Sequence, residues 1–175
     1  NGVKIMMFRK EFIDELIPYA KEFHKEISGD DFDIKYNTSF NWSGNEKSDE
    51  LYEKFLKAIE KKKESEETLG LSLVGPHRDD MEFIINGKSA SSYASQGQQR
   101  TAVISLKIAQ TKKIYDLTGE YPVLLLDDIM SELDKSRRDF LVNKVRDMQV
   151  IITCTDPIKA DNANYLKISG GRVCI

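Results

Sequence analysis

VLLLDD, residues 123–128, is an uninterrupted apolar run that ends in two aspartates. Such a run is typical of a strand that is buried on both faces of a parallel sheet. A helical stretch from about Asp134 to Asp147 follows, and then a second apolar run, Val150 to Ile152. This strand–helix–strand order predicts an α/β fold in which two parallel strands are joined by a right-handed crossover.

Asp127 and Asp128 lie at the carboxyl end of the first predicted strand, where open α/β sheets bind their ligands. Neighbouring strand residues point in opposite directions, so the two carboxylates can take separate tasks. One can hold a magnesium shell while the other faces an attacking water, as phosphoryl transfer requires. Taken alone, the pair fits equally well a strand end whose acids are merely solvated.

The remaining elements follow from periodicity and turn residues. We expect a helix over about 8–27, in which Pro18 kinks the helix or ends its first segment. A second helix begins with Ser48 as N-cap and has Lys61 to Lys63 at its C-terminal end. The other predicted elements are strands at 32–36, 69–74 and 81–85 with an Asn86-Gly87 turn, a helix over about 98–117, and a hairpin of 164–168 with 172–175.

The composition restricts the class of protein. With 175 residues, of which 40% are hydrophobic, the chain can bury one substantial core. Its formal net charge of −3 argues against a free-standing DNA-binding module, because it provides no global basic surface. The two cysteines suit a reducing compartment, and there is no signal-peptide pattern or apolar run of about 18 residues. We therefore expect a cytoplasmic location.

A second candidate ligand site precedes the predicted helix at about 98–117. Ser95-Gln96-Gly97-Gln98-Gln99-Arg100 places a hydroxyl, a glycine and backbone amides at a helix N-terminus, where unpaired N–H groups favour phosphate. A serine in this place can also be an ordinary helix cap. The stretch Ser131-Glu132-Leu133-Asp134 then follows the paired aspartates within one short loop.

These three motifs, in this order and spacing, resemble the ABC-type ATPase heads of SMC-like and recombination proteins. Residues 95–100 resemble the ABC signature with Gln96 in place of its first glycine, residues 123–128 the Walker B strand, and residues 131–134 the D-loop. Within that group, Gly75-Pro76-His77-Arg78-Asp79-Asp80 and the signature variant are similar to the RecF family. For Arg78, a phosphate contact and an ion pair with Asp79 or Asp80 remain equal alternatives.

The resemblance implies a role for each matching residue. Asp127 would be the magnesium-associated aspartate, and Asp128 would orient or deprotonate the water. The nucleotide contacts, several of them made to the nucleotide of the opposite subunit, would come from Ser95, Gln96, Gly97, Gln98, Asp134 and Thr155. Thr155 stands where ABC proteins commonly carry a switch histidine, and a hydroxyl cannot supply that positive charge.

The resemblance also implies an organisation: a mostly helical lobe at residues 1–68, part of lobe II, and the C-terminal half of the ATPase core at residues 69–175. No Gly-x-x-x-x-Gly-Lys-Ser/Thr motif and no initiator Met are present, so we expect a fragment that is inactive alone. ATP and Mg²⁺ binding would need an upstream half.

For the intact protein, the resemblance implies an ATPase of recombinational DNA repair and replication restart. It would form an ATP-dependent homodimeric clamp on single-stranded or gapped DNA, with RecO and RecR as partners. The alternatives are the head of another SMC-like or MutS-like ATPase, and a non-catalytic docking module derived from an ABC ATPase.

Overall fold

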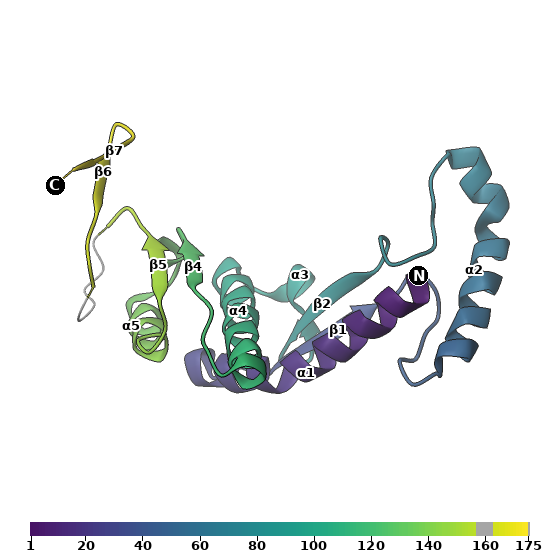
Figure 1. The fold of residues 1–175 in the computed structure, drawn as a ribbon, viewed down its shortest axis with the longest axis horizontal. Helices are drawn as coiled ribbons and strands as arrows, with labels where there is room; N and C mark the ends of the chain where they lie inside the picture. Colours follow the sequence, from purple (N-terminus) through teal and green to yellow (C-terminus); the bar gives the residue numbers. More distant parts are fainter. Residues whose placement is uncertain (157–162, 175) are drawn as a thin grey trace. The chain divides into compact units, whose positions relative to one another are not determined.

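The computed structural model describes residues 1–156 and 163–174 of the chain. The chain divides into two compact units, Asn1–Pro122 and Val123–Ile175 (Figure 1). This division does not fall at residue 68, because β1 (Phe32–Asn37) pairs with β2 (Asp80–Ile85) across that position. A lobe boundary of the ATPase at residue 68 stays a prediction.

The first unit is built on α1 (Gly2–Ser28), which begins earlier than expected and runs through Pro18 without ending. Proline removes one helical hydrogen bond, at a cost of about 3 kcal/mol. Ile13 and Leu16 before Pro18 and Ala20 after it are all buried, and Pro18 itself is exposed. Burial on both sides of the proline therefore offsets the lost bond, and of the two outcomes expected for Pro18, a kink or the end of a segment, the second does not occur.

The predicted strand over residues 69–74 is absent. α2 (Ser48–Leu69) continues beyond the three lysines to Gly70, so the lysines lie inside the helix. After it, the Glu66 carboxylate accepts hydrogen bonds from the N–H groups of Leu73 at 2.5 Å and Val74 at 3.3 Å. These side-chain contacts take up the donors that a strand partner would need.

An antiparallel sheet in the order β1-β2-β3 forms instead, with β3 at Lys88–Ser89. The predicted Asn86-Gly87 turn joins β2 to β3, with φ of 49° and 75°. Both residues lie in the left-handed region, which asparagine and glycine tolerate best.

The core of the first unit lies between α1, α4 (Gln96–Thr118) and β1, with the short helix α3 (Ala90–Tyr93) beside it. Buried His24 stacks on Phe32 with ring centroids 4.6 Å apart. The Ser105 hydroxyl donates to Thr101 O at 2.7 Å, so His24 Nδ1, 3.0 Å from the same oxygen, is the donor to Ser105. The apolar core residues are Ile13, Leu16, Ala20, Phe32, Ile34, Ile85, Ala90, Ala102 and Ala109.

The second unit contains the predicted parallel pair. β4 (Leu124–Asp127) pairs with β5 (Val150–Thr153), and α5 (Lys135–Lys144) connects them. Burial on both faces was a wrong prediction: Leu124 and Leu126 are buried, whereas Leu125 is 66% exposed. The reason is that this sheet has two strands within the described residues and one of its faces is open.

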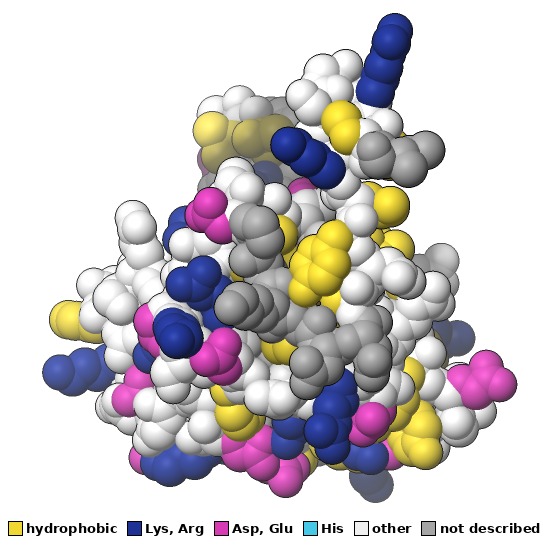
Figure 2. Space-filling view, turned by 90° about the vertical axis from the view of Figure 1, so that its left-hand side faces the viewer, with side chains coloured by type: hydrophobic (Ala, Val, Ile, Leu, Met, Phe, Trp, Pro, Cys, Tyr) yellow, Lys and Arg dark blue, Asp and Glu magenta, His cyan; other side chains and the backbone are white. Residues whose placement is uncertain are grey.

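A terminal hairpin of β6 (Lys167–Ser169) and β7 (Arg172–Cys174) forms around Gly170-Gly171, as expected. Its predicted last residue, Ile175, lies outside the described residues. Among the helices that the structure describes, none has the length and apolar character needed to cross a membrane. Figure 2 shows basic and acidic side chains interspersed on the face that it draws, in keeping with the small net charge.

Candidate functional site

The signature-like segment forms the start of α4. Ser95 is the N-cap: its Oγ accepts a hydrogen bond from Gln98 N at 3.3 Å, and Gln98 Oε1 accepts one from Ser95 N at 3.0 Å. This reciprocal pair is a capping box. Because Ser95 Oγ serves as acceptor here and Ser95 is exposed, its hydroxyl proton can still be donated to a ligand.

The side chains of Gln98 and Gln99 are directed toward the protein. Gln98 Nε2 donates to Asp30 Oδ2 at 3.2 Å, and Gln99 Nε2 donates to Ala90 O at 3.0 Å and Ala94 O at 3.3 Å. The Gln98 side chain, predicted to contact nucleotide, is therefore occupied at both ends of its amide. Ser95, exposed Gln96 and the backbone amides of the first turn, including that of Gly97, remain the groups suited to phosphate.

The paired acids form the corresponding feature of the second unit. Asp127 and Asp128 are both exposed at the carboxyl end of β4. The parallel register sets Asp127 opposite Thr153, and the Thr153 hydroxyl donates to Asp127 Oδ1. The same hydroxyl accepts a hydrogen bond from Asp128 N at 3.0 Å. One threonine thus fixes both the first carboxylate and the backbone of the second residue.

Sequence reasoning did not select Thr153. The signal was present, because pairing of the two apolar runs in parallel brings the residues at their carboxyl ends together. Thr155, which the sequence suggested, is exposed two residues beyond β5.

Asp128 has a left-handed backbone, with φ of 51°. This conformation is uncommon for a residue other than glycine, although aspartate tolerates it better than most. The Ser131 hydroxyl lies 2.9 Å from Asp128 O and 3.0 Å from Asp128 Oδ1. Ser131 therefore holds this turn and also the carboxylate that was predicted to face the water.

Asp134, the last residue of the D-loop-like segment, is the N-cap of α5. Its Oδ1 accepts a hydrogen bond from Arg137 N at 2.9 Å, and its Oδ2 lies 3.5 Å from Arg137 Nε. Within this chain, Asp134 thus has a local structural role. A contact to nucleotide along a dimer seam stays a prediction.

The chemistry of the two acids suits magnesium and a nucleotide. Magnesium is usually held by one or two carboxylates together with substrate phosphates and waters. Asp127 and Asp128 supply exposed carboxylate oxygens of this kind. Over residues 1–156 and 163–174, no group of three or more His, Cys, Asp or Glu side chains forms a metal cage, which a site completed by phosphates does not need.

The loop at residues 75–80 settles one alternative for Arg78. Its Nε donates to Ser72 O at 2.7 Å, and among the described residues Arg78 forms no ion pair with Asp79 or Asp80. Asp79 instead accepts hydrogen bonds from Tyr36 OH at 2.5 Å and Ser39 N at 3.0 Å. Burial and the bond to Asp79 raise the pKa of Tyr36 above its usual value. Asp79 is thus a structural anchor of this loop.

Comparison with known proteins gives a consistent set of relatives, although no family model matches. A "DNA replication and repair protein RecF" from Ruminiclostridium cellulolyticum is 40% identical over 176 residues, covering 97% of this chain and 47% of the relative. The RecF protein of Rippkaea orientalis is 40% identical over 181 residues, covering 99% and 47%. The chain therefore spans about half the length of the curated relatives that it matches.

Two solved structures are similar in fold as well as in sequence. The recombination mediator protein RecF-ATPrS in the RecFOR pathway superposes with a TM-score of 0.83 at 34% identity, over 98% of this chain and 46% of that one. The corresponding RecF-ATP structure has a TM-score of 0.80 at 32% identity, over 99% of this chain and 46% of the other.

Proposed function

Because the chain is homologous to the C-terminal half of RecF, the DNA replication and repair protein, we propose that it provides one half of a DNA-repair ATPase head. The observation that carries the proposal is the pair of exposed acids at the end of β4, held by Thr153 and Ser131. The upstream half would contribute the phosphate-binding loop, a motif that residues 1–175 do not contain.

The two acids would divide the work. Asp127, oriented by Thr153, would hold the magnesium shell, and Asp128, held by Ser131, would orient or deprotonate the attacking water. Bound magnesium would supply countercharge to the phosphate oxygens. Aspartate is one methylene shorter than the glutamate that many ABC proteins carry here, so we expect slow hydrolysis.

The signature segment would act on the nucleotide of a second subunit. Ser95 and the amides of Gln96 and Gly97 would meet its γ-phosphate, and Asp134 and Thr155 would lie along the same seam. Nucleotide would then favour the dimer by its differential affinity for that state. Such a dimer would clamp single-stranded or gapped DNA, with RecO and RecR as partners, and hydrolysis would open it. Work on DNA would place the protein in the cytoplasm.

The test is Asp128→Asn in the full-length protein. We expect kcat for ATP to fall by about 10² to 10⁴-fold, because the group that activates water is lost. Dimers on DNA should accumulate with ATP, and light scattering with native gels would measure them. Asp147→Asn, an exposed acid of the same unit, is the matched control and should retain activity. Unchanged ATP turnover and DNA binding in Asp128→Asn would instead indicate a non-catalytic docking module.

A further inference from the structure

We propose that Asp30, backed by Asn86, is a positioning residue that sets the start of α4 through the side chain of Gln98. This inference rests on the proposed function, because it assigns Asp30 to the segment that would meet the nucleotide of a second subunit. Neither Asp30 nor Asn86 belongs to the ABC-like motifs of the sequence, and Asp30 lies 68 residues from Gln98 along the chain.

Asp30 lies in the turn between α1 and β1, and it joins three segments. Its Oδ2 accepts a hydrogen bond from Gln98 Nε2 at 3.2 Å, and its Oδ1 accepts one from Asn86 Nδ2 at 2.8 Å. The partners are separated from Asp30 by 68 and 56 residues. Hydrogen bonds to a charged acceptor are stronger than neutral ones, so this carboxylate is a firm link between the β2–β3 turn and the signature helix.

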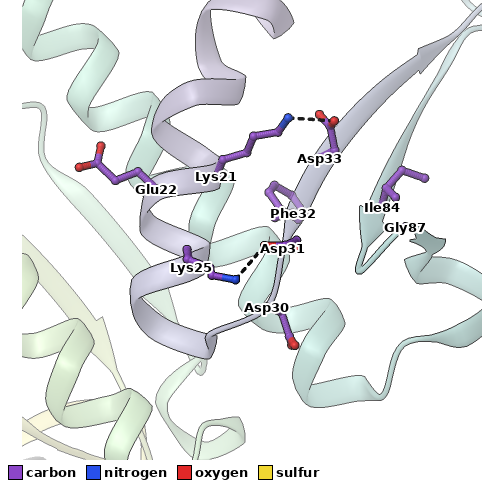
Figure 3. A pocket seen from close by; sticks show the side chains of 9 residues that line it. All are labelled: Lys21, Glu22, Lys25, Asp30, Asp31, Phe32, Asp33, Ile84 and Gly87. Carbon is purple, nitrogen blue, oxygen red and sulfur yellow. Dashed lines mark hydrogen bonds and ion pairs between the residues drawn. The ribbon is translucent and has the colours of Figure 1, made fainter.

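The carboxylate is itself held in place. Asn86 Oδ1 accepts a hydrogen bond from Asp31 N at 2.9 Å, and Asn86 N donates to Asp31 O at 2.9 Å. Figure 3 shows Asp30 at the edge of a pocket that contains two ion pairs, Lys25 with Asp31 and Lys21 with Asp33. The backbone of Asp31, next to Asp30, is thus held by Asn86 through two hydrogen bonds that do not involve Gln98.

The Gln98 amide passes this restraint to Ser95. Its nitrogen is bound to Asp30, and its oxygen accepts the Ser95 N–H at 3.0 Å. Because the amide is planar, holding the nitrogen also holds the oxygen. The Ser95 backbone therefore has a defined position, and its hydroxyl accepts Gln98 N–H at 3.3 Å. Such preorganisation matters because displacements of about 1 Å can cost about 10²-fold in rate. On this reading Gln98 supports the site and does not contact nucleotide.

The experiment exchanges donor and acceptor in the full-length protein. Gln98→Glu keeps an oxygen for Ser95 N–H, since glutamate is a common capping-box residue, but it sets a second carboxylate against Asp30. We expect kcat and the ATP-dependent dimer to fall by about 10-fold. Binding of a fluorescent ATP analogue to the monomer should change by less than about 2-fold, because the phosphate-binding loop lies elsewhere.

The double variant Asp30→Asn with Gln98→Glu should restore most of the activity. Its new amide can donate to Glu at 98 and still accept from Asn86, so the link is rebuilt with reversed polarity. Glu22→Gln, an exposed acid of α1 outside this set of contacts, is the matched control and should behave like the parent. A second variant keeps the inference testable if Gln98→Glu does not fold. Asn86→Gly keeps the left-handed turn but removes the side chain that supports Asp30, and its kcat should fall by less than about 10-fold.

Two results would overturn the inference: full activity and dimerisation in Gln98→Glu, or no recovery in the double variant. A failure of the proposed function has a different signature. In that case the unmodified full-length protein would neither dimerise with ATP nor hydrolyse it, which would overturn both proposals.

Discussion

Each carboxylate at the end of β4 is held by a hydroxyl, Asp127 by Thr153 and Asp128 by Ser131. Groups that orient a metal-binding carboxylate commonly affect metal affinity by about 10 to 100-fold. Thr153 also binds the backbone N–H of Asp128, so one side chain affects both acids. At this scale the site consists of four residues from two segments of the second unit.

Thr153→Val keeps the shape of the side chain and removes both hydrogen bonds. In the full-length protein we expect the Mg²⁺ concentration for half-maximal ATPase activity to rise by about 10-fold, because Asp127 loses its orientation. Thr153→Ser should restore the parent value. Thr155→Val tests the other threonine. If ATPase activity falls in Thr155→Val and is unchanged in Thr153→Val, the nucleotide contact lies at Thr155 and the role given to Thr153 is wrong.

Asp116 makes the free energy of unfolding depend on pH. Its Oδ2 accepts the Tyr19 hydroxyl at 2.6 Å, and its Oδ1 lies 3.0 Å from Lys112 Nζ. The Tyr19 hydrogen bond, followed by that of Lys112, lowers the pKa of Asp116 below its usual 3.8. The charged form is the stabilised one, so its contribution is complete above the unfolded value and is lost as the pH falls through the folded value.

The free energy of unfolding of Asp116→Asn should therefore depend less on pH in the acid range than that of the parent. We expect its urea midpoint to fall below that of the parent at pH 7 and to approach the parent value as the pH falls below 3.8. Unfolding followed by circular dichroism between those pH values would measure this. A constant difference between the two proteins across the range would contradict it.

Among the elements, α1 and α4 define the first unit. α1 has a buried stripe on both sides of Pro18, and α4 begins at a capping box and ends at Gly119 in the left-handed region. The elements with strong local signals were predicted correctly in kind: both of these helices, β1, β2, β4, β5, α5 and the terminal hairpin. The strand expected at 69–74 failed because Glu66 captures its backbone donors.

The packing of α1 predicts that alanine substitutions at two of its apolar residues will lower the free energy of unfolding by very different amounts. Leu16 is 2% exposed, and Leu16→Ala should lower the free energy of unfolding by about 2 to 5 kcal/mol, since it leaves a cavity. Phe8 is 68% exposed, and Phe8→Ala should cost less than about 1 kcal/mol. Equilibrium urea unfolding would measure both, and equal losses would show that the α1 stripe is not the core.

For the whole molecule, the open face of the β4–β5 sheet is the main feature that the sequence did not indicate. Leu125 is 66% exposed and Ile151 is 54% exposed on adjacent strands. Exposed apolar strand surface of this kind promotes association. The curated relatives are about twice as long as this chain.

The chain by itself should therefore self-associate, and Leu125→Lys with Ile151→Lys should lower its mass-average molecular mass in solution. Size-exclusion chromatography with light scattering would measure this over a range of concentrations. Leu166→Lys, at an exposed residue outside β4 and β5, is the control. If the double variant still self-associates and Leu166→Lys does not, the associating surface is not the face of the β4–β5 sheet.

The sequence by itself determined the order of the motifs, the cap at Ser95 and the parallel pairing of two apolar runs. These depend on contiguous residues, because a cap and a buried strand are encoded within a few positions. The tertiary structure alone decided that the carboxylate of Asp30 holds Gln98 and is itself bonded to Asn86. Those partners lie 68 and 56 residues from Asp30, and no local pattern specifies contacts made by the path of the chain in space.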